Sequence, residues 1–204
     1  MRLSEKTTKI LQNFTSINQS LHFKEGNTLR TISVMKNVLA EAEIEEYIPR
    51  EFAIYDLPQF LNTLSLTNAA SIDVTTDHSH ALIRGNASNK TKFFFCDPSV
   101  IVAPPEKQMT LPSVDVEFML GEQDLRSLLK ASSIMQLPDL SVIGNGNTVE
   151  VVVSDRKNDT SNEFNLTVGQ TDNTFSFNFK IENIKTLIGG YHVSISKKNL
   201  AKFY

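Results

Sequence analysis

The chain has 204 residues, a formal net charge of −3 and a single cysteine, Cys96. This length fits one large domain or two domains of about 100 residues, which is near the common domain size. An acidic balance argues against a protein that coats nucleic acid by bulk attraction, although it permits a basic face on an acidic body. One cysteine excludes an internal disulfide, and we expect its thiol to be buried and inert beside three phenylalanines.

The sequence has no apolar run near the ~20 residues that a membrane span requires. Its first residues are not typical of a signal peptide, because a helical pattern begins at Ser4. We therefore expect a cytosolic protein without membrane contact.

The first half is predicted to alternate two helices with groups of short strands. Ser4 can cap a helix whose apolar stripe includes Leu11 and Phe14. Asp56 can cap a second helix, with Pro58 in its first turn, where a missing N–H costs nothing. Hairpin and turn signals place strands before the second helix at 21–24, 28–34, 38–43 and 52–55, and after it at 70–74, 80–85, 92–96 and 99–102.

Three prolines interrupt the middle of the chain. Pro104, Pro105 and Pro112 fix φ and remove backbone donors, so residues 103–114 do not suit a central strand or a helix interior. We predict an extended connector between two halves.

The second half repeats the order of the first. A predicted strand at 113–119 precedes a helix at 121–132 that turns its leucines inward. Further strands are predicted at 140–143, 148–153, 163–168, 174–179 and 191–196. Between the last two strands, a short helix stopped by Gly189-Gly190 is predicted from the spacing of Ile181, Ile184, Leu187 and Ile188.

Each half thus reads helix, strands, helix, strands, which indicates an internal duplication. The predicted fold class is α+β, with antiparallel sheets and two helices in each of two duplicated domains. We place domain one at 1–103, the connector at 104–113 and domain two at 114–204. The second copy has fewer strands after its last helix, so we expect it to lack the final strand or strands.

Catalytic chemistry finds little support in the sequence. Asp73, Asp77, His78 and His80 suggest a metal-dependent hydrolase at most, because this stretch is more typical of a solvated hairpin turn. No glycine-rich phosphate loop or Gly-x-Ser-x-Gly elbow occurs, and Cys96 has no evident histidine partner. We expect no enzymatic activity, no metal and no cofactor.

Basic residues follow acidic first turns on the predicted helices. They are Lys6, Lys9, Arg126, Lys130 and Lys185. On one helix this pattern describes an ordinary solvated face. Four such helices side by side on a sheet would instead form one mildly basic surface, suited to loose contact with a phosphate backbone.

Several short motifs, taken in order, resemble one known family. They are Leu3-Ser4-x-x-Thr7-Thr8 with Leu11 and Asn13-Phe14, Ala53-Ile54-Tyr55-Asp56-Leu57, Phe60-Leu61, Leu64-Ser65-Leu66, Asp97-Pro98-Ser99, Val102-Ala103-Pro104 and Ala201-Lys202-Phe203. Over nearly the whole chain, and most closely in its first half, they resemble the trimeric DNA polymerase sliding clamps of tailed bacteriophages. These processivity factors are related in fold to proliferating cell nuclear antigen.

The resemblance implies three two-domain subunits in a ring around duplex DNA, with helices lining the hole and sheets outside. The residues implied to face DNA are Lys6, Lys9, Arg126, Lys130 and Lys185. Paired edge strands would close the ring. The implied interface residues are Ser99, Val100, Ile101, Phe164, Leu166 and Val168. A groove for a partner peptide is implied at Val102, Leu111 and Pro112.

The implied partners are the replicative DNA polymerase, an ATP-dependent clamp loader and late-transcription factors. The implied location is the cytoplasm of the infected bacterial host. The sequence leaves open one alternative of another class, which is a two-domain structural or adaptor protein of a virion that does not encircle DNA.

Overall fold

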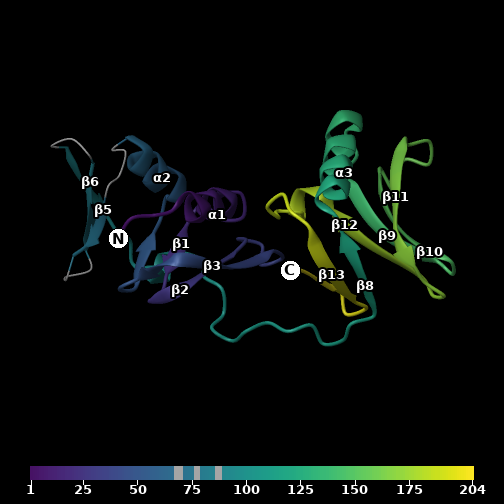
Figure 1. Ribbon diagram of the computed structural model, residues 1–204, viewed down its shortest axis with the longest axis horizontal. Coiled ribbons are helices and arrows are strands. Elements are labelled where there is room, and N and C mark those ends of the chain that lie inside the picture. Colours follow the sequence, from purple (N-terminus) through teal and green to yellow (C-terminus); the bar gives the residue numbers. More distant parts are fainter. Residues whose placement is uncertain (67–70, 76–78, 86–88) are drawn as a thin grey trace. The chain divides into compact units, whose positions relative to one another are not determined.

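The computed structural model describes residues 1–66, 71–75, 79–85 and 89–204. The chain forms two compact units, Met1–Glu106 and Lys107–Tyr204. The division falls inside the predicted connector. Figure 1 shows both units and labels their α-helices and most of their strands.

Two helices in the first unit begin where side-chain caps were predicted. α1 spans Glu5–Thr15, and the Ser4 hydroxyl accepts a hydrogen bond from the Thr7 backbone N–H at 3.1 Å. α2 spans Leu57–Leu66, and Asp56 accepts from the Gln59 N–H at 2.7 Å. Each cap satisfies a backbone donor that the first turn leaves unpaired.

The strands of the first unit form three small antiparallel sheets. β1 (Leu21–Phe23) pairs with β4 (Phe52–Ile54), and β2 (Gly26–Ile32) pairs with β3 (Leu39–Ile48). β5 (Ser71–Val74), β6 (His80–Arg84) and β7 (Lys90–Phe94) form the third sheet. A core that includes Leu11, Phe23 and Phe60 joins the helices to these strands.

The strand predicted at 99–102 is wrong. A 3-10 helix, η1 (Pro98–Val100), occupies this place. Asp97 accepts from the Ser99 N–H at 2.8 Å, and Pro98 takes the first helical position. This local capping competes with extended pairing and turns the backbone away from a strand.

The second unit has one α-helix and two antiparallel sheets within its described residues. β8 (Val116–Leu120) leads into α3 (Glu122–Met135), which ends at Gln136 with a left-handed φ of 55°. The larger sheet has the order β11-β10-β9-β12, and the smaller has the order β14-β13-β8. The strand bounds are β9 Asp139–Asn145, β10 Thr148–Ser154, β11 Glu163–Gln170, β12 Thr174–Lys180, β13 Tyr191–Ser196 and β14 Leu200–Phe203.

The short helix predicted at 181–188 is also wrong. Only a 3-10 turn, η2 (Ile181–Asn183), forms before the backbone leaves helical geometry at Ile184, where ψ is 84°. Ile181 and Ile184 still pack against the core, so their apolar spacing reports burial without an α-helix. β-branched residues and two following glycines make a helix of this length unfavourable.

The described part of the chain therefore has three α-helices, where four were predicted. Among them, none is long and apolar enough to cross a membrane.

Candidate nucleic-acid and partner surfaces

The exposed face of α1 carries two lysines. Lys6 and Lys9 are exposed, whereas Ile10, Leu11 and Phe14 are buried on the opposite face. The helix therefore presents two positive charges to solvent while its apolar stripe is fixed in the core.

Glu46 on β3 holds the first turn of α1 in place. Its carboxylate accepts a hydrogen bond from the Thr7 hydroxyl at 2.5 Å and another from the Ser4 backbone N–H. Burial alone would raise the pKa of Glu46, but the hydrogen bonds from Thr7 and Ser4 outweigh it and lower the pKa. Glu46 is thus an ionised carboxylate that anchors the helical turn in which Lys6 lies.

The exposed face of α3 is less basic than its sequence suggests. Arg126 donates from Nε and Nη2 to one oxygen of Glu122, at 3.0 and 2.8 Å. An exposed pair of this kind adds little stability, but it offsets the positive charge of Arg126. Lys130 is exposed and forms no ion pair with any described residue.

Lys185 does not lie on a helix. It follows η2 in irregular backbone and is half-buried. The structure thus places four of the five predicted basic residues on exposed helix faces, and places Lys185 apart from them.

The start of the connector is held against the first unit. Buried Asn18 donates from Nδ2 to the Val102 carbonyl at 3.1 Å and to the Ile32 carbonyl at 2.9 Å. Arg30 donates to the Pro105 carbonyl at 2.9 Å, and Lys24 pairs with Glu106 at 2.9 Å.

The predicted peptide groove is divided between the two units. Val102 lies in the first unit, whereas half-buried Leu111 and exposed Pro112 lie in the second. A single groove formed by all three stays a prediction.

One of the two predicted subunit edges is a strand. β11 lies at the end of its sheet, so no other described strand pairs with its outer edge. Phe164, Leu166 and Val168 turn their side chains toward the core of the second unit. Any pairing of β11 with another subunit would therefore use its backbone and the alternate, exposed side chains.

The other predicted edge, at Ser99, Val100 and Ile101, belongs to η1 and the residue after it. Ser99 and Val100 are exposed and Ile101 is partly buried. They do not offer a strand edge, although their place in an interface stays a prediction.

The suggested metal site is only partly described. Asp77 and His78 lie outside the described residues. Asp73 pairs with Arg84, and the His80 ring contacts the Ser79 hydroxyl at 2.7 Å. Among described residues, no three of the types His, Cys, Asp and Glu come together as metal ligands would.

Two anchoring residues had no sequence signal. Glu46 reaches Thr7 across 39 positions of the chain, and Asn18 reaches Val102 across 84. Neither spacing corresponds to a local motif, so only the folded structure reveals these contacts.

The architecture is that of the DNA clamps. Proliferating cellular nuclear antigen from Entamoeba histolytica matches with a TM-score of 0.67 at 15% identity, over 93% of this chain and 85% of the other. The Thermococcus kodakaraensis protein matches with a TM-score of 0.65 at 13% identity, over 96% and 92%. At such identities, the likeness shows the fold alone.

Sequence comparison identifies the family. Residues 3–103 match the DNA polymerase processivity factor family, and residues 117–204 match the C-terminal domain of the gp45 sliding clamp. The sliding clamp of Vibrio phage KVP40 is 30% identical over 100% of this chain and 94% of its own length. That of Enterobacteria phage T4 is 31% identical over 100% and 92%. The chain belongs to the sliding-clamp family of DNA polymerase processivity factors, and these relatives favour the clamp over the virion-adaptor alternative.

Proposed function

We propose that three copies of this chain close a ring around duplex DNA and tether the replicative polymerase of the phage to its template. The observation that carries this proposal is the exposed lysines of α1 and α3 on a chain with net charge −3. A ring is retained by its topology, so weak and sequence-independent phosphate contacts suffice and permit sliding. In this role the chain is a non-catalytic accessory protein.

Two related structures support assembly and peptide binding. One structure is a complex of two clamp proteins, PCNA2 and PCNA3, from Sulfolobus tokodaii. Another shows the clamp of A. fulgidus bound to the C-terminal region of FEN-1. By analogy, we propose that a polymerase peptide docks at Val102, Leu111 and Pro112.

The proposal extends to loading and location. An ATP-driven loader would open the ring and place it on DNA, and we propose no ATP hydrolysis by the clamp itself. The proposed location is the cytoplasm of the infected bacterium, where late-transcription factors are further candidates for the same groove.

Charge reversal on the helices tests the DNA-facing surface. Lys6→Glu, Lys9→Glu and Lys130→Glu together should shorten the products that the polymerase makes in one binding event by about tenfold, because repulsion replaces phosphate contacts. The measurement is product length on a primed template with the loader present. Sedimentation should show an unchanged oligomer.

The matched control reverses Lys36, Lys197 and Lys198, which are exposed residues in turns. It changes the net charge equally and should leave product length unchanged. Equal losses in both variants, or no loss in the helix variant, would remove α1 and α3 from the DNA role.

A further inference from the structure

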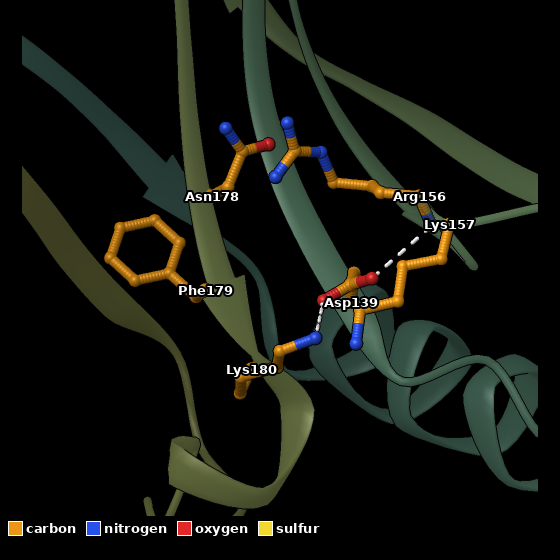
Figure 2. Close-up of a pocket in the computed structure, with 6 residues that line it drawn as sticks. All are labelled: Asp139, Arg156, Lys157, Asn178, Phe179 and Lys180. Carbon is orange, nitrogen blue, oxygen red and sulfur yellow. Dashed lines mark hydrogen bonds and ion pairs between the residues drawn. The ribbon is translucent and has the colours of Figure 1, made fainter.

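A basic hollow lies at one end of the larger sheet of the second unit (Figure 2). It has a volume of about 250 Å³, and its lining residues are Asp139, Arg156, Lys157, Asn178, Phe179 and Lys180. Asp139 begins β9, Lys180 ends β12, and Arg156 and Lys157 follow the end of β10. Three segments that are distant in sequence therefore bring their polar residues together at one place.

Asp139 is fixed at the base of this hollow. It is only 4% exposed, and it accepts from Lys180 Nζ at 2.5 Å and from the Arg156 backbone N–H at 3.1 Å. Burial alone would raise the pKa of Asp139, but the hydrogen bonds from Lys180 and Arg156 outweigh it and lower the pKa. Asp139 is therefore ionised at neutral pH, and its charge offsets that of Lys180.

Two positive charges line the hollow in addition to Lys180, and one of them, Arg156, also helps to lower the pKa of Asp139 through its charge. The side chains of Arg156 and Lys157 are exposed, and within the described ranges neither forms an ion pair. The nearby carboxylate of Asp155 turns into its own loop, where it accepts from the Lys157 backbone N–H at 3.0 Å. An excess of positive charge in a hollow on an acidic chain attracts an anion.

Strand register places the hollow on the face of the sheet away from α3. Asp139 lies opposite Lys180 in the ladder, and Ser141 lies opposite Asn178. The alternate residues, which include Leu140, pack in one core with Leu125 and Leu128 of α3. Because successive side chains of a strand point to opposite faces, the hollow opens on the side that the helix does not cover. A DNA backbone along the exposed face of α3 would not reach it.

We propose that this hollow docks a carboxylate side chain from an acidic segment of a partner protein. The guanidinium of Arg156 can donate two parallel hydrogen bonds to a carboxylate, and Lys157 adds a second positive charge beside it. Asp139 keeps Lys180 in place and limits the net attraction, so the hollow favours a single anionic group. The residues of this hollow are distinct from those of the proposed DNA surface and of the proposed peptide groove.

Peptide binding tests the proposal directly. The probe is a short fluorescein-labelled peptide of alternating glutamate and serine, and the readout is fluorescence anisotropy with the full chain. Arg156→Glu with Lys157→Glu should weaken binding by at least about tenfold, since two charge-assisted contacts are lost. The backbone N–H that donates to Asp139 remains in this variant, and an unchanged melting temperature would confirm that the unit is intact.

The control is Lys197→Glu with Lys198→Glu, which makes the same charge change in another exposed turn of this unit. It should reduce binding by no more than about twofold through long-range charge. Inorganic phosphate should compete if the hollow accepts oxyanions in general, and this arm separates a free anion from a peptide. Equal weakening in both variants, or no binding of the peptide by the unaltered chain, would overturn the proposal.

Processivity identifies the alternative occupant. The Arg156/Lys157 variant should keep full product length in the polymerase assay with the purified loader, because the hollow is off the helix face. Shortened products together with unchanged peptide binding would show that DNA occupies the hollow and would refute the carboxylate assignment. The Lys6/Lys9/Lys130 variant should shorten the polymerase products whatever the result of the peptide assay, so the two proposals are tested separately.

Discussion

At the scale of single residues, the molecule relies on polar side chains that bridge distant segments. Glu46 ties β3 to the first turn of α1, and Asn18 ties the end of α1 to the connector. Removing Glu46 would leave two donors unpaired, and removing Asn18 would leave two carbonyl acceptors unpaired. An unpaired polar group in a partly buried place costs more than a hydrogen bond itself contributes. These residues make sharper tests of the fold than an exposed charge does.

Glu46→Gln should destabilise the chain in a pH-dependent manner. The folded-state pKa of Glu46 is lowered from its ordinary value of 4.5, so its stabilisation is present above that value and is lost as pH falls through the folded pKa. The stability difference from the unaltered chain should be about 1 kcal/mol at pH 7 and should vanish in acid. Thermal unfolding between pH 7 and pH 3 measures it.

Glu45→Gln is the matched control, because Glu45 is exposed on the same strand. It should change stability little at any pH. A Glu46→Gln deficit that stays constant with pH would show that the carboxylate charge is not what holds α1.

Asn18→Ala should destabilise the first unit by about 2 kcal/mol, because the buried Ile32 carbonyl and the partly buried Val102 carbonyl lose a donor. It should also speed trypsin cleavage after Lys107, since the connector start loses an anchor. Chemical unfolding and limited proteolysis measure these two effects. Gln19→Ala, at an exposed neighbour, should show neither, and cleavage at an unchanged rate would contradict the anchoring role.

At the scale of elements, the sequence predicted the helices and the tight turn, because capping residues, apolar spacing and glycine act within a few residues of each other. Caps and apolar stripes located α1, α2 and α3, and the Gly-Asn-Gly-Asn turn between β9 and β10 contains Gly146 at a φ of 84°. The two errors arose where apolar spacing had two explanations. At 181–188 burial occurs without a helix, and at 99–102 the Asp97 cap prevails over β propensity. Exposure of the helix lysines was predictable from the stripe opposite them, and the Arg126–Glu122 pair has the i,i+4 spacing that a helix brings together. The contacts of Glu46 with Ser4 and Thr7 required side-chain positions.

The edge of β11 provides a test at this scale. Asn165→Lys with Thr167→Lys places charge on exposed positions of the edge, which opposes strand pairing between subunits. The variant should shift the oligomer to lower mass in sedimentation at an unchanged melting temperature of the isolated subunit.

The control for this edge is Thr174→Lys with Ser176→Lys on β12, the opposite edge of the same sheet. It should leave the mass unchanged. An oligomer that resists the β11 change would exclude this edge from the subunit interface.

At the scale of the whole molecule, the chain has two units with separate cores, and each unit carries exposed basic residues on an α-helix. The first core gathers α1, α2 and the first-unit strands, and the second gathers α3 with both of its sheets. Exposed lysines on the helix faces of an acidic chain suit the proposed ring, which would retain DNA by topology and needs only weak phosphate contacts. The proposed carboxylate hollow would add a protein contact on a separate surface of the second unit.

The anchored connector sets the length of the tether between the units. Contacts from Asn18, Arg30 and Lys24 hold 102–106 on the first unit, and Asp115 joins the second through a hydrogen bond to the Ile195 carbonyl at 2.9 Å. The Ser113 hydroxyl also contacts the Ser196 hydroxyl of the second unit at 2.8 Å. Residues 107–112 are then left to span, which is at most ~3.6 Å per residue or roughly 22 Å. Deleting one residue from this stretch shortens the greatest distance that it can span. Deleting a residue from 103–106 instead disrupts the contacts with Arg30 and Lys24 that hold this segment on the first unit. If a loader opens the proposed ring, the reach between the two units would therefore depend on the Asn18 contacts as well as on the length of the free stretch.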